Sequence, residues 1–274
     1  MNIFIYIKRI IAMLVFNKIV QKLWTKWWKI IFKSDIFELI DPEKKKENNN
    51  KINKIIYKLK ASNIIITLKA GVYIIPKQED LELNKLDLIE KYYFKLLKKY
   101  ITYYLWNDYY ISWIKSLEIH NKNYSVSDKI YIINRNLNKK IFFWNYQIIF
   151  KTISWKLNNK KINLFNKFKI YTVKKNIEWY EFKISCLELS LLESTLISDS
   201  EFWFDLWLIN KTIKKYHKFF NKEKFYDIWR YKYIMSFNRL KELSKPIDLN
   251  LYNLFLDIIK KNWWLFIWEW LRQI

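Results

Sequence analysis

The feature that most constrains this chain is its single glycine, Gly71, among 274 residues. Glycine reaches positive φ without steric cost, and phosphate-binding loops and nucleophile elbows depend on it. The chain therefore has no G-x-G-x-x-G motif, no Walker A loop and no G-x-S-x-G elbow. With one cysteine, Cys186, and two histidines, His120 and His217, a disulfide scaffold and a Cys/His zinc site are excluded as well. We expect no catalytic residues, no metal and no cofactor.

Tryptophan is as abundant as glycine is rare, with 15 copies in the chain. Residue usage also favours AT-rich codons, since 45 of the 50 basic residues are lysine. Average usage of about 7% predicts roughly 19 glycines in a chain of this length. The simplest cause of the tryptophan excess is a genetic code that reads UGA as tryptophan. A code that reads UGA as glycine would explain both anomalies, so we predict that many tryptophans occupy glycine positions. The best candidates are Trp27, Trp28, Trp113, Trp144, Trp179, Trp263 and Trp264.

The first 78 residues have the pattern of a winged helix-turn-helix. An apolar N-terminal segment that carries internal charges predicts an amphipathic helix and not a membrane span or signal peptide. A short helix capped by Ser34 and a helix capped by Asn50 follow, separated by a polar loop. Ile52, Ile55, Ile56 and Leu59 recur at i, i+3, i+4 and i+7 in the second of these helices, which predicts one buried face.

Two β runs, 64–68 and 72–75, then flank Lys69-Ala70-Gly71 and predict a hairpin with the only glycine in its turn. Helix, short helix, helix and hairpin is the order of a winged helix, in which the third helix enters the major groove of DNA.

Charge supports a separate DNA-binding module. Residues 1–78 carry 16 Lys and Arg against 5 Asp and Glu, a net charge of +11, whereas the other 196 residues carry a net +13. Lysines on the outer face of the third helix would contact phosphates, and its Asn and Tyr side chains would reach base edges. The same lysines also fit the solvated face of an amphipathic helix. The expected DNA-binding residues are Ser34, Asn50, Lys51, Asn53, Lys54, Tyr57, Lys58 and Lys69.

Residues 79–274 have a mixed pattern. A helical segment starts near Asn84, a β-rich middle follows, and the pattern is helical from Leu187 onward. The expected fold class is therefore α+β: a winged helix-turn-helix over residues 1–78, followed by a mixed α/β antitoxin-like domain over 79–274 with a helical C-terminal part.

Short motifs in this order resemble a known family. They are Phe32-Lys33-Ser34-Asp35-Ile36, Lys69-Ala70-Gly71-Val72-Tyr73, Tyr110-Ile111-Ser112-Trp113, Ser116-Leu117-Glu118-Ile119-His120, Phe143-Trp144-Asn145, Ile184-Ser185-Cys186-Leu187-Glu188 and Leu191-Leu192-Glu193. Together the motifs resemble the AbiE-type antitoxin (AbiEi) family of transcriptional regulators from abortive-infection and type IV toxin–antitoxin loci. Trp113 and Trp144 stand where that family has glycine. The resemblance implies a DNA-binding domain, an antitoxin domain, autorepression of the operon and a nucleotidyltransferase-like toxin as partner.

Two other classes of function remain open. High basicity also suits an RNA-binding or ribosomal structural protein of an AT-rich organelle or symbiont. An enzyme is the third class: Glu181-x-Lys183 resembles half of a restriction-type nuclease site, which needs a second acidic residue on an upstream strand to hold Mg²⁺. The winged-helix order favours the regulator, with double-stranded operator DNA as partner, a cytoplasmic location and no membrane association.

Overall fold

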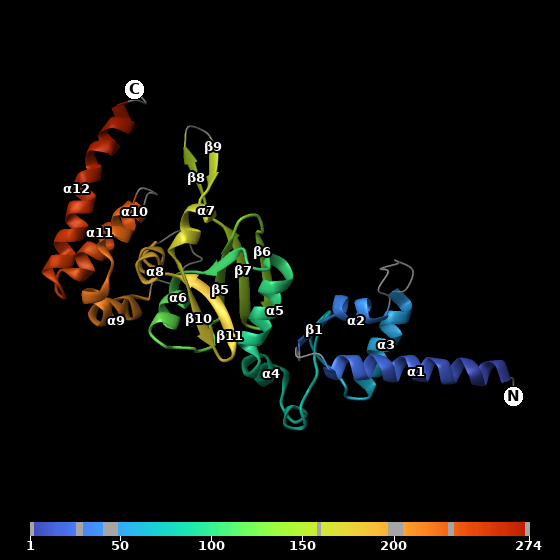
Figure 1. Ribbon diagram of the computed structural model, residues 1–274. Coiled ribbons are helices and arrows are strands. Elements are labelled where there is room, and N and C mark those ends of the chain that lie inside the picture. Colours follow the sequence, from blue (N-terminus) through green and yellow to red (C-terminus); the bar gives the residue numbers. More distant parts are fainter. Residues whose placement is uncertain are drawn as a thin grey trace. The chain divides into compact units, whose positions relative to one another are not determined.

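The computed structural model describes residues 3–25, 30–40, 49–157, 160–196, 205–229 and 233–271. The arrangement is mixed α+β, with a helix at the N-terminus and a helical C-terminal part, which confirms the expected α+β class (Figure 1). Contacts between Cα atoms divide the chain into residues 1–99 and 100–274. The sequence pattern places the boundary earlier, at 78/79.

The N-terminal unit combines helices with a three-stranded antiparallel sheet in the order β1-β3-β2. Its elements are α1 (Ile3–Thr25), β1 (Ile30–Phe32), α2 (Lys33–Ile40), α3 (Asn49–Ala61), β2 (Ile66–Lys69), β3 (Val72–Ile74), the 3-10 turn Gln78–Asp80, α4 (Lys85–Lys91) and the start of α5 (Tyr93–Leu105). The first three helices and the sheet region share one apolar core: Ile19, Leu23, Ile31, Ile36, Ile52, Ile56, Leu59, Ile65 and Tyr73. The predicted inner face of α3 is confirmed, with Ile55 half-buried.

The predicted hairpin is confirmed. Lys69 pairs with Val72, so Ala70 and Gly71 form the turn, and Gly71 has a φ of +77°. That conformation is open to glycine at little cost. Asn63 ends α3 in the left-handed region at φ +53°, where asparagine is the usual substitute for glycine.

A buried carboxylate ties the segment after the hairpin to α4. The Asp80 side chain accepts hydrogen bonds from the Lys77 backbone N–H (2.7 Å), the Tyr92 hydroxyl (2.7 Å) and Lys91 Nζ (2.7 Å). Lys99 Nζ reaches the Asp35 carboxylate at 2.7 Å. These bonds explain why residues 79–99 group with the N-terminal unit.

A six-stranded mixed sheet in the order β10-β11-β4-β5-β7-β6 forms the centre of the second unit. The strands are β4 (Tyr109–Ile111), β5 (Lys129–Asn134), β6 (Lys139–Phe143), β7 (Tyr146–Thr152), β10 (Thr172–Ile177) and β11 (Tyr180–Ser185), and β8 (Ser154–Leu157) pairs with β9 (Lys160–Asn163) separately. The pairs β11–β4 and β5–β7 are parallel, and the other pairs within the sheet are antiparallel. The β-rich middle of the chain is thus confirmed.

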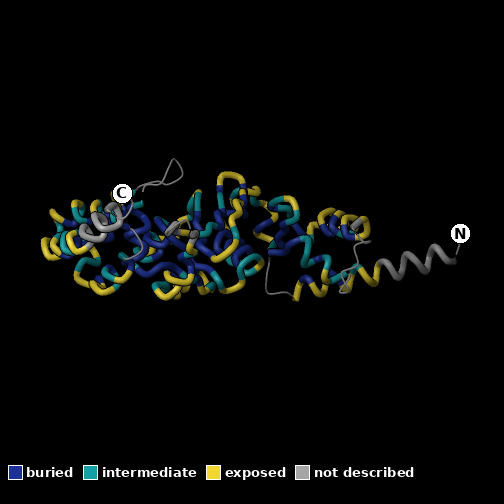
Figure 2. Tube along the Cα trace, turned by 90° about the horizontal axis from the view of Figure 1, so that it is seen from above, coloured by how far each residue is buried: buried dark blue, intermediate teal, exposed yellow. Residues whose placement is uncertain are grey.

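Helices α6 and α8 pack against this sheet at β5 and β11, and the later helices extend the same core. Along the trace in Figure 2, buried stretches (dark blue) alternate with exposed ones (yellow). The helical elements of this unit are α6 (Trp113–His120), α7 (Phe165–Phe168), the 3-10 turns Lys169–Tyr171 and His217–Phe219, α8 (Leu187–Ser194), α9 (Leu206–Tyr216), α10 (Lys222–Trp229), α11 (Ile234–Ser244) and α12 (Leu249–Leu271). The helical pattern predicted from Leu187 onward is confirmed.

Tryptophan is over-represented in the left-handed backbone region. Among the described non-glycine residues with positive φ are Trp106 (+53°), Trp113 (+54°) and Trp144 (+49°). Trp144 sits in the two-residue turn between β6 and β7 with 64% of its surface exposed, and Trp106 is 72% exposed, as expected for a tryptophan at a glycine position.

Other tryptophan candidates differ from the expectation. The Trp113 ring is buried and packs edge-to-face on Tyr131 at 4.7 Å, which is the packing of a genuine tryptophan and not the exposed ring expected at a glycine position. Trp179 fits the expectation in part: it is 98% exposed in the β10–β11 turn, although the positive φ of that turn falls on Glu178. Trp263 and Trp264 lie inside α12 and not in a turn or at a helix end, where a glycine position is expected. Trp27 and Trp28 lie outside the described residues.

Trp144→Gly is expected to stabilise the protein by about 1 kcal/mol, because it removes the strain of a left-handed Cβ-bearing residue. Its melting temperature should rise by about 2–4 °C. Trp207→Gly is the matched control, since Trp207 is similarly exposed (68%) but lies within α9, where glycine should destabilise by about 1 kcal/mol. A Trp144→Gly variant that melts lower than the parent would contradict the glycine assignment at this turn.

Candidate nucleic-acid interface

Helix α3 presents one polar, basic face to solvent. Lys51, Lys54 and Lys58 are all exposed, at i, i+3 and i+7, while Ile52, Ile56 and Leu59 are buried on the opposite side. This spacing places the three ammonium groups along one stripe of the helix. No Asp or Glu occurs anywhere in α3 to neutralise them.

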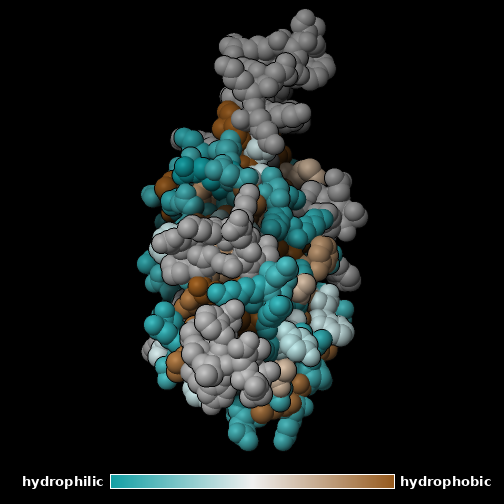
Figure 3. All heavy atoms as spheres, turned by 90° about the vertical axis from the view of Figure 1, so that its right-hand side faces the viewer, coloured by the Kyte–Doolittle hydropathy of each residue, from teal (hydrophilic) through white to brown (hydrophobic). Residues whose placement is uncertain are grey.

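The same face carries the uncharged polar candidates. Asn50 and Asn53 are exposed, and Tyr57 is 73% exposed although its ring is large and apolar. In Figure 3 most of the described surface that faces the viewer is hydrophilic, with small separate hydrophobic patches. Because Tyr57 is exposed between lysines, its ring is available to a partner. We define the candidate interface as the α3 face, made of Asn50, Lys51, Asn53, Lys54, Tyr57 and Lys58.

Two expectations about helix starts are wrong. Helix α2 begins at Lys33, so Ser34 lies inside its first turn, and the buried Ser34 hydroxyl has no hydrogen-bond partner among the described residues. Ser34 therefore cannot contact a phosphate in this conformation. Helix α3 begins at Asn49, so Asn50 is not its N-cap, but Asn50 remains on the exposed face.

The start of α2 is organised by Asp35 instead. Its Oδ2 accepts the Phe32 backbone N–H at 3.0 Å and lies 2.7 Å from Lys99 Nζ, which also lies over the Phe32 ring. A first-turn aspartate was visible in the sequence, but its partner 64 residues later was not. Lys69, in the last position of β2, is half-buried.

A second polar group that the sequence did not reveal lies buried in the other unit. Glu193 of α8 is fully buried; its Oε1 accepts the Tyr110 hydroxyl at 3.1 Å, and its Oε2 accepts the Ser112 hydroxyl at 2.5 Å. The Trp113 backbone N–H also donates to it. Burial raises the pKa of Glu193 to about 7, although these donors favour the charged form.

Three buried serines link α6, β11 and α8. The hydroxyls of Ser116, Ser185 and Ser190 lie 2.6–2.9 Å from one another. His120 Nε2 contacts the Ser185 carbonyl at 2.8 Å, and burial lowers the pKa of the imidazole. The imidazole thus bonds a carbonyl and no hydroxyl of this cluster, which is a structural arrangement and not a nucleophile–base pair.

Cys186 is buried in the apolar core of the same unit, and burial raises the pKa of its thiol to about 12. Cys186 therefore packs as a small buried hydrophobe.

The half-motif Glu181-x-Lys183 lies on β11, beside β4. Because Ile184 pairs with Ile111 in parallel, counting back three residues along both segments brings Glu181 level with Asp108. Each acid is already ion-paired: Glu181 with Lys174 at 2.9 Å, and Asp108 with Lys169 at 2.8 Å. Lys183 Nζ donates to the Asn107 carbonyl at 2.8 Å. The cations that surround these acids disfavour Mg²⁺ binding there.

Comparison with models of known protein families and with curated protein sequences finds no match to this chain. Among the described residues, no helix combines the length and apolarity needed to cross a membrane.

Proposed function

We propose that residues 1–99 are a winged-helix module that binds double-stranded DNA through the α3 face, and that the protein is a transcriptional regulator. The observation that carries the proposal is the exposed stripe of Lys51, Lys54 and Lys58 on a helix whose other face is buried. The hairpin that follows α3 and the short strand that pairs with it supply the elements of a wing.

The DNA-binding proposal predicts a specific salt dependence. Affinity of the full chain for duplex DNA, measured by fluorescence anisotropy, should fall linearly on a log–log plot against salt, with a slope of about −0.9 per phosphate contacted. Single-stranded DNA and double-stranded RNA of the same sequence are the comparison ligands. Tighter binding to the RNA would favour the RNA-binding alternative, and a slope near zero on every ligand would contradict both.

The antitoxin role rests on the motif resemblance. In this proposal the chain represses its own operon in the cytoplasm and counteracts a nucleotidyltransferase-like toxin encoded beside it, without catalysing a reaction. Expression of the neighbouring gene should stop growth, and co-expression of this chain should restore it. A harmless neighbour, or toxicity that this chain leaves unchanged, would separate DNA binding from the antitoxin role.

A further inference from the structure

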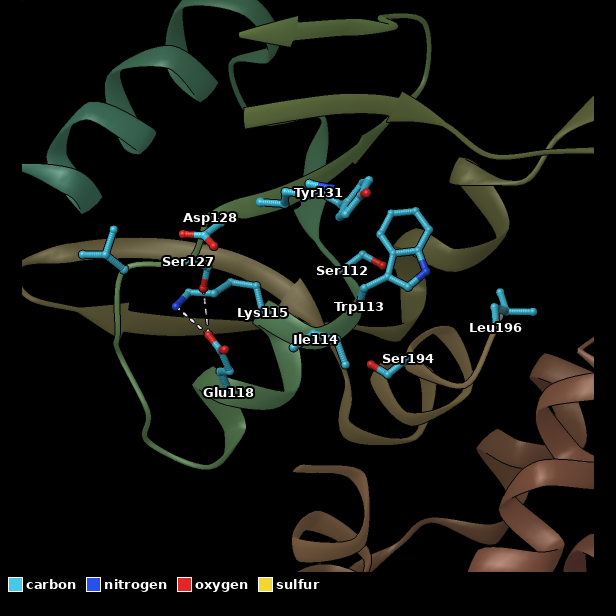
Figure 4. Close-up of a pocket in the computed structure, with 12 residues that line it drawn as sticks. Ser112, Trp113, Ile114, Lys115, Glu118, Ser127, Asp128, Tyr131, Ser194 and Leu196 are labelled. Atoms are coloured by element: carbon cyan, nitrogen blue, oxygen red, sulfur yellow. Dashed lines mark hydrogen bonds and ion pairs between the residues drawn. The ribbon is translucent and has the colours of Figure 1, made fainter. Parts of the chain in front are cut away.

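The second unit contains a cavity that the DNA-binding proposal does not use. Its volume is about 390 Å³, within the range of small-molecule sites, and it lies between α6, the start of β5 and the end of α8. Its lining residues are Ser112, Trp113, Ile114, Lys115, Glu118, Val126, Ser127, Asp128, Lys129, Tyr131, Ser194 and Leu196 (Figure 4).

One end of the cavity is apolar and aromatic. Trp113 and Tyr131 meet edge-to-face with ring centroids 4.7 Å apart and planes at 68°, which forms a corner suited to a flat ring. Leu196 lines the cavity on the Trp113 side, away from the charged residues (Figure 4).

The other end is polar and its charges balance. Lys115 Nζ bonds the Glu118 carboxylate at 2.8 Å and also the Ser125 carbonyl, and the Ser127 hydroxyl donates to the same Glu118 oxygen at 3.0 Å. Next to this paired group, Asp128 is exposed and Lys129 is half-buried, and neither has an ion-pair partner among the described residues. One free carboxylate and one free ammonium favour a ligand that is neutral overall and carries both signs of charge.

A buried hydroxyl in the wall lacks a partner. Ser194 is 3% exposed, and its Oγ makes no hydrogen bond among the described residues; in Figure 4 it points toward the neighbouring Ile114. Leaving a buried hydroxyl unsatisfied costs about 1–3 kcal/mol. A ligand atom that bonds this hydroxyl would recover that cost.

We propose that this cavity binds a zwitterionic aromatic amino acid. The aromatic ring lies in the corner of Trp113 and Tyr131 and its polar edge reaches Ser194, while the ammonium faces Asp128 and the carboxylate faces Lys129. The proposal is independent of DNA binding, since every residue in it belongs to the second unit.

Isothermal titration and thermal shift of the full chain test the proposal with L-tryptophan as the probe and L-phenylalanine, whose ring has no polar edge to reach Ser194, as the comparison. Tryptamine lacks the carboxylate and indole-3-propionate lacks the ammonium, so each should bind about fivefold to tenfold more weakly than L-tryptophan. Asp128→Asn should weaken the binding of L-tryptophan by a similar factor. Asp227→Asn, at an exposed aspartate of α10 outside the cavity, should leave this binding unchanged.

Ser194→Ala separates ligand binding from a structural role. Without ligand the variant should melt at the parent temperature or above, since it loses an unsatisfied hydroxyl, yet its affinity for L-tryptophan should fall about fivefold. Ser236→Ala is the matched control, because Ser236 is also buried and unpartnered but does not line the cavity. Absence of binding of L-tryptophan at about 10 mM, or equal affinity for all three indole compounds, would overturn the proposal.

Discussion

Replacing Lys51, Lys54 and Lys58 together by alanine is expected to weaken binding of the full chain to duplex DNA by about 500-fold at ~0.1 M salt. Each lysine that neutralises a phosphate contributes about 0.9 to the magnitude of the slope of log affinity against log salt. The slope of the triple variant should therefore be smaller in magnitude by about 2.7. Because all three side chains are exposed on α3, their removal leaves the core of the N-terminal unit intact. Fluorescence anisotropy between about 50 and 200 mM salt measures both quantities.

Lys211, Lys214 and Lys218 provide the matched control. They are exposed and have the same i, i+3, i+7 spacing, but they lie on and just after α9 in the other unit. Their replacement by alanine should leave the slope close to that of the parent. If the α3 variant keeps the parent's affinity and slope, the stripe is only a solvated helix face. If both variants weaken equally, binding reflects net charge and not the α3 face.

Glu193→Ala is expected to destabilise the protein by about 3 kcal/mol or more, measured by urea denaturation. The substitution leaves the buried hydroxyls of Tyr110 and Ser112 without their acceptor and opens a void among α6, α8 and β4. Circular dichroism without denaturant checks that the variant still folds. A loss below about 1 kcal/mol would show that the surrounding groups find other partners.

Glu193 should also make stability depend on pH. Burial raises the pKa of its carboxyl from 4.5 to about 7 in the folded chain, so folded protein retains a proton that unfolded protein has released. The stabilisation of the folded state by this group is therefore fully present below about pH 4.5 and is lost as the pH rises to about 7. Glu193→Gln, which resembles the neutral acid, should flatten this part of the profile. A profile that is unchanged in the glutamine variant would assign the dependence to another group.

Features set by neighbours in the chain could be predicted from the sequence, and features set by distant residues could not. The buried face of α3 and the β2–β3 hairpin follow from helical spacing and from the glycine in the turn. Strand β1 has only three residues and exists because it pairs with β3, about 40 positions later. A pattern of three residues does not distinguish a strand from a loop.

The candidate site divides in the same way. The lysines of α3 were predictable because exposure follows from the opposite apolar face. The N-cap predicted at Ser34 was wrong because α2 begins at Lys33, one residue earlier. The Asp35 carboxylate near this start pairs with Lys99, which is distant in the sequence. The Glu193 group joins residues about 80 positions apart, and the cavity beside it depends on α6, β5 and α8 meeting. No local pattern encodes either arrangement.

The hydrogen bonds of Asp80 determine where this protein can be divided for experiments. A fragment that ends at Gln78 would keep the Lys77 N–H but lose the carboxylate that accepts it, together with Tyr92 and Lys91. It would also lack Lys99, the partner of Asp35 at the start of α2. A protease-resistant N-terminal piece should therefore extend past α4 into α5, and limited proteolysis should spare the peptide bonds around Asp80.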